Sequence, residues 1–283
     1  MKKGLYIYFL IPVFMIGGLV FALVNGTASQ GGDFIEVISV GQGDSTLVKS
    51  GGRAMLIDVG PNRNGVDSGA KYIVPHMRAL GITKLDWILL SHPDADHVGG
   101  LGSVMQAYPE AKVIVPICFE NDSKMIEALK KGGVSASDAI WTAGEDGNLG
   151  NFKVNVRCPV WNPATDDNLG CMFVKVSDGP QCAFTTSGDA PMEVEWQMIP
   201  ILDWRAQILH LGHHGSKFST SPEWLKAVNP EITIASCGYH NEYHHPAPST
   251  VRRVTDFGTK FYRTDLDGDL LFKVENHQFA KTN

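Results

Sequence analysis

The sequence predicts an α/β fold, of the α+β kind, in which β-sheets pack face to face and helices lie outside them. Short runs that favour extended structure recur along the chain, and helix-like segments lie between and after them. The first half opens with hairpin-like strands, and the middle of the chain carries a second cluster of strands. This order suits packed sheets better than one purely parallel, doubly wound sheet. About 250 residues follow the N-terminal segment, which is enough for one large domain.

Each predicted strand is a short run bounded by turn residues. In chain order, the predicted strands lie at 34–40, 46–49, 54–58, 87–90, 112–115, 152–158, 171–176, 182–186, 206–211, 232–235, 260–263 and 269–274. Four predicted helices carry terminal signals, either a glycine after the last turn or a proline in the first turn. These helices lie at 69–80, 122–131, 222–228 and 248–257.

The first thirty residues are expected to lie outside the domain. Lys2 and Lys3 precede an uncharged apolar stretch at 4–24, and small polar residues follow at 25–32. This is the pattern of a secretory signal peptide, and roughly 21 apolar residues are also long enough to span a bilayer. We therefore expect residues 1–30 to be a signal peptide or an N-terminal membrane anchor. In either case the rest of the chain is exported, as a periplasmic, secreted or membrane-anchored protein.

The composition describes a mildly acidic protein. The formal net charge is −6, and it becomes −8 without Lys2 and Lys3. The exported part therefore lacks the basic field of a high-affinity nucleic-acid binder. A nuclease that needs only a local basic groove is still compatible with this charge.

The cysteines indicate no structural metal knuckle, because the chain contains no CxxC pair. Cys171 and Cys182 lie on neighbouring apolar runs and could form a disulfide in an oxidising compartment. Equally, all the cysteines could be buried thiols, which is the interpretation we favour. The five are Cys118, Cys158, Cys171, Cys182 and Cys237.

The most informative run of residues lies at 91–100. It places His92, Asp94, Asp96 and His97 directly after an apolar predicted strand, where ligands usually bind in layered α/β folds. Two imidazoles and two carboxylates offer nitrogen and oxygen ligands to a divalent metal. The alternative is a surface loop in which Asp94 or Asp96 caps a helix. A cap explains one carboxylate and neither histidine, so we favour metal binding.

Three further acids stand at turns or strand ends. Asp44 follows two glycines in the turn between the first two predicted strands, and Asp58 precedes a Gly-Pro turn. Taken alone, each is a common turn residue. Asp189 follows an apolar run and a glycine, where it is either a helix N-cap or a bridging metal ligand.

Several histidines in the last third of the chain could complete such a site. His213 and His214 stand between glycines, which lets both side chains turn inward. His245 precedes Pro246, which restricts its backbone to extended conformations. The remaining histidines are expected to be packed or exposed without a functional role: His76, His210, His240, His244 and His277.

Taken in order, these motifs resemble the metallo-β-lactamase superfamily. More closely, they look like the hydrolase-like domain at the C-terminus of the ComEC competence proteins. The resemblance runs from about residue 33 to about residue 272. It implies a four-layer αββα sandwich over residues 33–275, a single domain with a metal site at the sheet edges. The motifs lie at 40–45, 56–60, 91–100, 187–189, 212–216 and 245–248.

The resemblance implies a two-metal site. His92 and Asp94 would bind one ion, Asp96 and His97 the other, and Asp189 would bridge them. Asp96 would also orient the attacking water. The cofactors are then one or two divalent ions, either zinc or the harder manganese and magnesium.

The later residues take supporting roles in the same implied site. His245 is favoured as the late histidine ligand, with His213 or His214 as a ligand or a contact to the leaving group. Lys217 or His214 would contact a phosphate oxygen. Asp58 and Asp44 would support the ligands from behind them.

The chain departs from the superfamily pattern in the first half of the site. Histidine is more common in the superfamily where Asp94 stands, although ComEC-like members share this aspartate. The usual middle histidine is also missing, because no histidine occurs from 98 to 209. The first metal site is therefore richer in oxygen, which shifts its preference from zinc towards manganese or magnesium.

Three functions are compatible with these residues. The first is hydrolysis of a phosphodiester, with single-stranded DNA or a small phosphodiester as substrate, by a ComEC-like nuclease. The second is hydrolysis of a lactone, thioester or β-lactam. The third is a catalytically silent module that binds DNA or another ligand. A single apolar segment cannot form a DNA-conducting pore, so we expect a stand-alone exported relative.

Overall fold

The computed structural model describes residues 32–160, 166–179 and 182–282, and residues from Gly32 onward form one compact unit. The predicted signal peptide or anchor at 1–30 lies outside the described residues. Within the described ranges, no helix combines the length and hydropathy that a bilayer crossing requires.

The strands of the described part form two large mixed sheets and one short two-stranded ribbon. The first sheet has the order β17-β16-β1-β2-β3-β6-β7-β8, and the second has the order β15-β14-β13-β12-β11-β10-β9. The strands of the first sheet are β1 (Phe34–Val37), β2 (Thr46–Ser50), β3 (Arg53–Ile57), β6 (Trp87–Leu89), β7 (Lys112–Pro116), β8 (Ile140–Thr142), β16 (Leu270–Glu275) and β17 (Gln278–Lys281). Those of the second are β9 (Gly144–Leu149), β10 (Phe152–Arg157), β11 (Phe173–Ser177), β12 (Ala183–Thr186), β13 (Ile208–His210), β14 (Ile232–Ala235) and β15 (Lys260–Arg263), and the ribbon is β4 (Asn62–Arg63) with β5 (Val66–Asp67).

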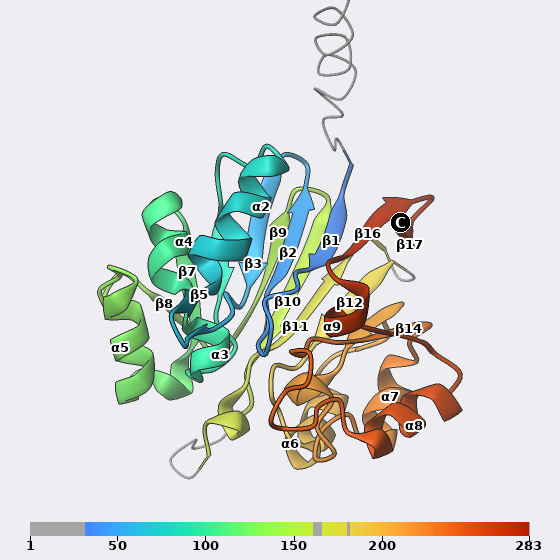
Figure 1. Ribbon diagram of the computed structural model, residues 1–283. Helices are drawn as coiled ribbons and strands as arrows, with labels where there is room; N and C mark the ends of the chain where they lie inside the picture. The colour runs from blue at the N-terminus through green and yellow to red at the C-terminus, as the bar shows by residue number, and fades with distance from the viewer. Residues whose placement is uncertain (1–31, 161–165, 180–181, 283) are drawn as a thin grey trace, which may run out of the picture. The chain divides into compact units, whose positions relative to one another are not determined.

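Helices cover the outer faces of both sheets, as Figure 1 shows for α2, α4 and α5 on one side and α6, α7 and α8 on the other. A π-helical turn at Gly69–Ile73 leads into α2, and a 3-10 turn at Gly212–Gly215 follows β13. The α-helices are α2 (Val74–Ala79), α3 (Ala95–Val98), α4 (Leu101–Ala107), α5 (Ser123–Lys131), α6 (Met192–Met198), α7 (Pro222–Val228), α8 (Pro248–Asp256) and α9 (Thr264–Asp267).

Three apolar clusters explain the layering. Alternate residues of β1 point to opposite faces, so Phe34 packs under the helices while Ile35 packs between the sheets. The central cluster joins residues of both sheets, for example Val48 with Phe184. The outermost cluster on the far side packs Trp224 of α7 against the second sheet. The fold is therefore the αββα sandwich that the sequence and its resemblance predicted.

Each sheet combines an antiparallel half with a parallel half, and this topology positions the functional residues. Strands β1, β2 and β3 form antiparallel pairs, and β3, β6, β7 and β8 run parallel. In the second sheet β12, β13, β14 and β15 run parallel. The carboxyl ends of parallel strands in both sheets therefore carry the loops that hold the predicted site.

The predicted elements differ from the observed ones mainly at their ends. The first strand ends at Val37 because the chain then enters the turn that carries Asp44, whose backbone N–H bonds to Asp96 O. The predicted helix at 69–80 divides into a π-helical turn and α2. Strand β9 was missed because it is polar and Gly-rich; it is held by pairing with β10 along its whole length.

The cysteines are all unpaired, and Cys171 and Cys182 are both fully buried. Burial raises the pKa of the Cys171 thiol well above its ordinary value and that of Cys182 to about 12. This agrees with the interpretation of the cysteines as small apolar residues rather than as a disulfide framework.

Candidate metal centre

The centre lies where loops from both sheets meet. Asp44 comes from the β1–β2 turn, His97 from α3 after β6, Asp189 from the loop after β12, and His214 from the turn after β13. These four side chains are buried, and one ligand atom from each lies within 4.8 Å of the others. Segments that are far apart in the sequence thus deliver nitrogen and oxygen donors to one point.

The backbone at Asp94, in the 91–100 motif, leaves the Asp94 carboxylate free of the helix that follows it. Asp94 occupies the N-cap position of α3, with φ −67° and ψ 144°. Its carboxylate, however, makes no capping hydrogen bond to the helix. Asp94 therefore stands at the N-cap position, as the alternative interpretation expected, but its side chain is not used for the cap.

His97 is oriented from behind by Asp58. Its Nδ1 lies 2.8 Å from Asp58 Oδ2, and Ser91 donates its N–H to Asp58 Oδ1 and its hydroxyl to Asp58 Oδ2, both at 2.7 Å. The Ser91 hydroxyl oxygen also lies 3.0 Å from His92 Nδ1. With their Nδ1 atoms engaged in this way, His92 and His97 direct Nε2 into the centre.

The inward nitrogen atoms are the test of whether a metal fits. The Nε2 atoms of His92 and His97 and the Oδ1 atom of Asp189 are buried without a hydrogen-bond partner. His97 Nε2 nevertheless lies 3.2 Å from Asp189 Oδ1. Buried polar atoms rarely stay unsatisfied, and bound divalent cations would satisfy all three. The donor set therefore fits a divalent metal.

Asp189 occupies the central position. Its Oδ2 lies 3.6 Å from His213 Nε2, 3.7 Å from His214 Nε2 and 3.9 Å from His92 Nε2. The preceding Gly188 has φ 53°, and a Cβ there would lie 3.0 Å from the Ser91 side chain. Asp189 is therefore the carboxylate that can face both halves of the site.

The two adjacent histidines turn inward through left-handed backbone conformations. His213 has φ 50° and ψ 50°, and His214 has φ 55° and ψ 22°, which is strained for residues other than glycine. His214 Nδ1 lies 3.1 Å from both Asp44 Oδ1 and Ser236 O, and its Nε2 lies 3.2 Å from Asp96 Oδ2. Asp44 thus supports His214 as Asp58 supports His97.

Burial and charge oppose each other in this cluster. Burial alone would lower the pKa of His97 and His214, but the nearby carboxylates, Asp189 foremost, hold both well above the ordinary value. Burial likewise opposes ionisation of Asp96 and Asp189, yet the histidines hold the pKa of each carboxyl below its usual range. The carboxylates therefore stay ionised at neutral pH and favour a bound cation.

His245 and Lys217 lie outside the four-residue cluster. The His245 ring centre lies 5.5 Å from that of His213 and 6.2 Å from that of His214, and burial together with these histidines lowers its pKa to about 4. Its buried Nδ1 has no hydrogen-bond partner. The ammonium of Lys217 lies 4.8 Å from the ring centre of Phe218, on an exposed part of the loop. His245 therefore borders the centre, whereas Lys217 faces solvent.

Some residues near the centre escaped the sequence analysis. Ser91 opens the 91–100 motif, and its place directly after a strand was a usable signal. His210, expected to be merely packed, bonds to Ser236 Oγ at 2.9 Å and lies 3.8 Å from Asp44. His76, expected to have no role, forms a separate group, with its Nε2 2.9 Å from a Glu36 oxygen.

Comparison with known proteins agrees with this geometry. The family model described as "Metallo-beta-lactamase superfamily" matches residues 38–117. The solved structure of Igni18, a metallo hydrolase from Ignicoccus hospitalis, covers 86% of this chain and 100% of its own at 17% identity, with a TM-score of 0.55. The chain belongs to the metallo-β-lactamase superfamily.

Within that superfamily the chain is related to competence proteins. It is 27% identical to ComE operon protein 3 of Bacillus subtilis over 86% of this chain, and 32% identical to competence protein ComA of Neisseria gonorrhoeae over 84%. It spans about a third of the length of these relatives, 33% and 32% respectively. The domain is therefore ComEC-like and carries a buried histidine–aspartate metal site.

Proposed function

We propose that this protein is an exported metal-dependent phosphodiesterase of the ComEC-like type, acting on single-stranded DNA or a smaller phosphodiester. The observation that carries the proposal is the buried cluster with unpartnered inward atoms on His92, His97 and Asp189. The donor set is rich in carboxylates, which favours manganese or magnesium over zinc. The relatives' printed names, which refer to competence, support a nucleic-acid substrate.

The residues of this chain would divide the work as follows. When bound, divalent ions would supply Lewis acidity, activating water for attack and neutralising charge on the phosphate. Asp96 would orient the water. The ions would be held by His92, Asp94, Asp96, His97, Asp189 and His214. His213 and His245 border the opening of the centre and would contact the phosphodiester or its leaving group.

The surface beside α3 provides room for an extended substrate. A cavity of 550 Å³ lies along Asp94, Lys124 and Lys131, and another of 730 Å³ lies along Asp96, Arg63 and Tyr243. The cations are paired, since Lys131 contacts Glu127 and Arg63 contacts Glu242, both at 2.8 Å. DNA binding should therefore be modest and should weaken steeply with salt.

The test is cleavage of single-stranded DNA and bis-p-nitrophenyl phosphate by purified protein with manganese, magnesium or zinc. We expect metal-dependent turnover that His92→Ala abolishes and His277→Ala preserves, because the His277 ring is exposed beside Asp178. No turnover with any of the metals, or equal turnover in His92→Ala, would contradict the proposal. Metal-free protein that binds DNA without cutting would favour a silent binding module, and nitrocefin hydrolysis would favour a β-lactam hydrolase.

A further inference from the structure

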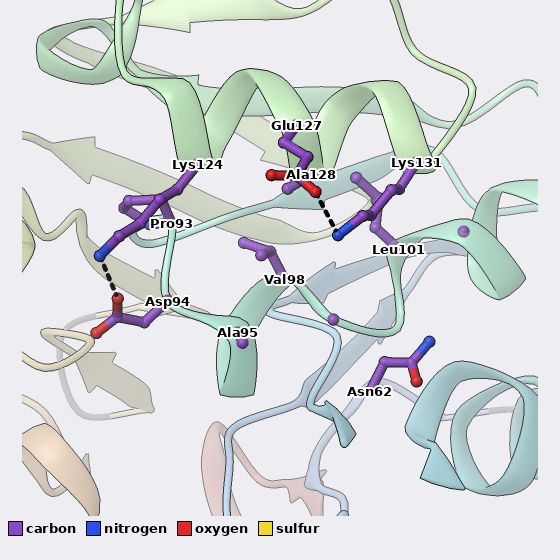
Figure 2. Close-up of a pocket in the computed structure, with 12 residues that line it drawn as sticks. Asn62, Pro93, Asp94, Ala95, Val98, Leu101, Lys124, Glu127, Ala128 and Lys131 are labelled. Atoms are coloured by element: carbon purple, nitrogen blue, oxygen red, sulfur yellow. Dashed lines mark ion pairs between the residues drawn. The ribbon is translucent and has the colours of Figure 1, made fainter. Parts of the chain in front are cut away.

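Asp94 lies between the imidazole of His92 and the ammonium of Lys124. Its Oδ2 lies 3.6 Å from His92 Nε2, and its Oδ1 lies 3.5 Å from the ammonium of Lys124. Figure 2 shows Lys124 pointing from α5 toward Asp94, whereas Lys131, further along the helix, points toward Glu127. One metal-ligating candidate is thus already engaged by a cation of the chain itself.

Lys124 is held at this position by a second acid. Its ammonium pairs with Asp167 of the 3-10 turn at Asp167–Gly170 as well as with Asp94. A lysine is protonated at neutral pH, and these two carboxylates are its partners. Asp94 alone among the predicted ligands has a lysine partner in the described structure.

The two halves of the centre therefore differ in charge. The half containing His97 and His214 is lined by Asp96 and Asp189, and no lysine among the described residues pairs with these two carboxylates. The half containing His92 lacks the superfamily's middle histidine. There the neighbouring ammonium competes with a divalent ion for the same carboxylate.

We propose that Lys124 lowers the affinity of the His92–Asp94 half for a divalent ion, so that the two halves load in sequence, with the Asp96–His97 half first. The inference rests on the metal site of the proposed function. A divalent ion on Asp94 must displace the ammonium or bind close to it, and the two positive charges repel. Partial exposure screens this repulsion, so we expect a fivefold to tenfold effect on affinity rather than exclusion.

The experiment is a titration of metal-free full-length protein with Mn²⁺ alone. Calorimetry and electron paramagnetic resonance monitor the binding of each ion. The variant Lys124→Met removes the charge and keeps an apolar stem. Lys131→Met is the matched control, on the same helix and beside the same cavity but paired with Glu127. Lys124→Arg keeps the charge.

We expect Lys124→Met to bind the second Mn²⁺ at least fivefold more tightly than wild type, and to show the spin-coupled signal of paired ions at lower metal concentration. Lys131→Met and Lys124→Arg should stay within twofold of wild type. Asp167→Asn should weaken the second site further, because Lys124 then has only Asp94 as a partner.

Equal binding of the second ion by Lys124→Met and Lys131→Met would overturn this inference and leave the metal assignment standing. If wild type and every variant bound no Mn²⁺, both the proposed function and this inference would fail. Because the readout is metal stoichiometry, catalytic inactivity cannot be mistaken for either result.

Discussion

Replacing Asp58 with asparagine tests whether Asp58 orients His97 for metal binding, because the substitution replaces one carboxylate oxygen with an amide nitrogen. The Asp58 carboxylate accepts from Ser91 N–H, from the Ser91 hydroxyl and from His97 Nδ1–H, at 2.7, 2.7 and 2.8 Å. A carboxylate only accepts, so it holds the proton on His97 Nδ1 and leaves Nε2 free to bind a metal. An asparagine amide facing Nδ1 would donate instead and move the ring proton to Nε2.

The expected cost has two parts. Metal affinity should fall 10- to 100-fold, which is about 1.4 to 2.7 kcal/mol, as for loss of a partner that orients a metal-binding histidine. The stability of the metal-free protein should fall by about 1 to 3 kcal/mol, because the asparagine leaves the Ser91 hydroxyl or His97 without its charged acceptor.

The assays are metal competition with a chromophoric chelator and long-range ¹⁵N–¹H spectra that report the histidine tautomer. The control is Asp86→Asn, since Asp86 also accepts a backbone N–H, from Ala54, and pairs with Arg53 away from the centre. Wild-type metal affinity in Asp58→Asn, or an equal loss in Asp86→Asn, would refute the reasoning.

Three further outcomes are expected. Gly215→Ala should destabilise the fold by about 1 to 3 kcal/mol in urea unfolding, since its φ is 82° and a Cβ would lie 2.6 Å from Pro246. Gly133→Ala, at φ 70° with nothing within 4 Å, should cost less, and an equal cost would contradict the steric argument. Burial raises the pKa of Glu195 to about 7. The native state therefore binds more protons than the unfolded state between about pH 4.5 and 7, and stability falls across that window by at most about 3 kcal/mol. Glu195→Gln should flatten the fall of the unfolding free energy with pH. If wild type and variant showed the same pH dependence of the unfolding free energy, Glu195 would not titrate in this window. Removal of metal by a chelator should lower the melting temperature of wild type, because bound ions stabilise only the native state. It should lower that of His92→Ala less, because this variant keeps only the ion of the Asp96–His97 half.

The sequence was sufficient for the class of fold and for placing the residues of the 91–100 motif beside one another at the end of a strand. Alternating apolar residues define the strands locally, and the residues after a parallel strand necessarily lie at its carboxyl edge. His92, Asp94, Asp96 and His97 are neighbours in the chain, so their proximity needed no knowledge of the tertiary structure. Polar edge strands such as β9 could not be found in this way, because their stability comes from a pairing partner.

The roles of individual side chains depended on the tertiary structure. Asp44 and His214 are 170 residues apart, and only the meeting of the two sheets places them 3.1 Å from each other. Lys124 is likewise brought beside Asp94 by the tertiary structure, since it lies on α5, outside the 91–100 motif.

By itself, the sequence determined that this chain folds as a layered α/β domain with a histidine–aspartate motif at a strand end. The tertiary structure decided that His214 lies in the buried cluster while His245 borders it, and that Asp94 has a lysine as a partner. The physical reason is that periodicity and turn chemistry are local properties of the chain. Ligand geometry and charge pairing instead depend on how loops from two sheets approach each other.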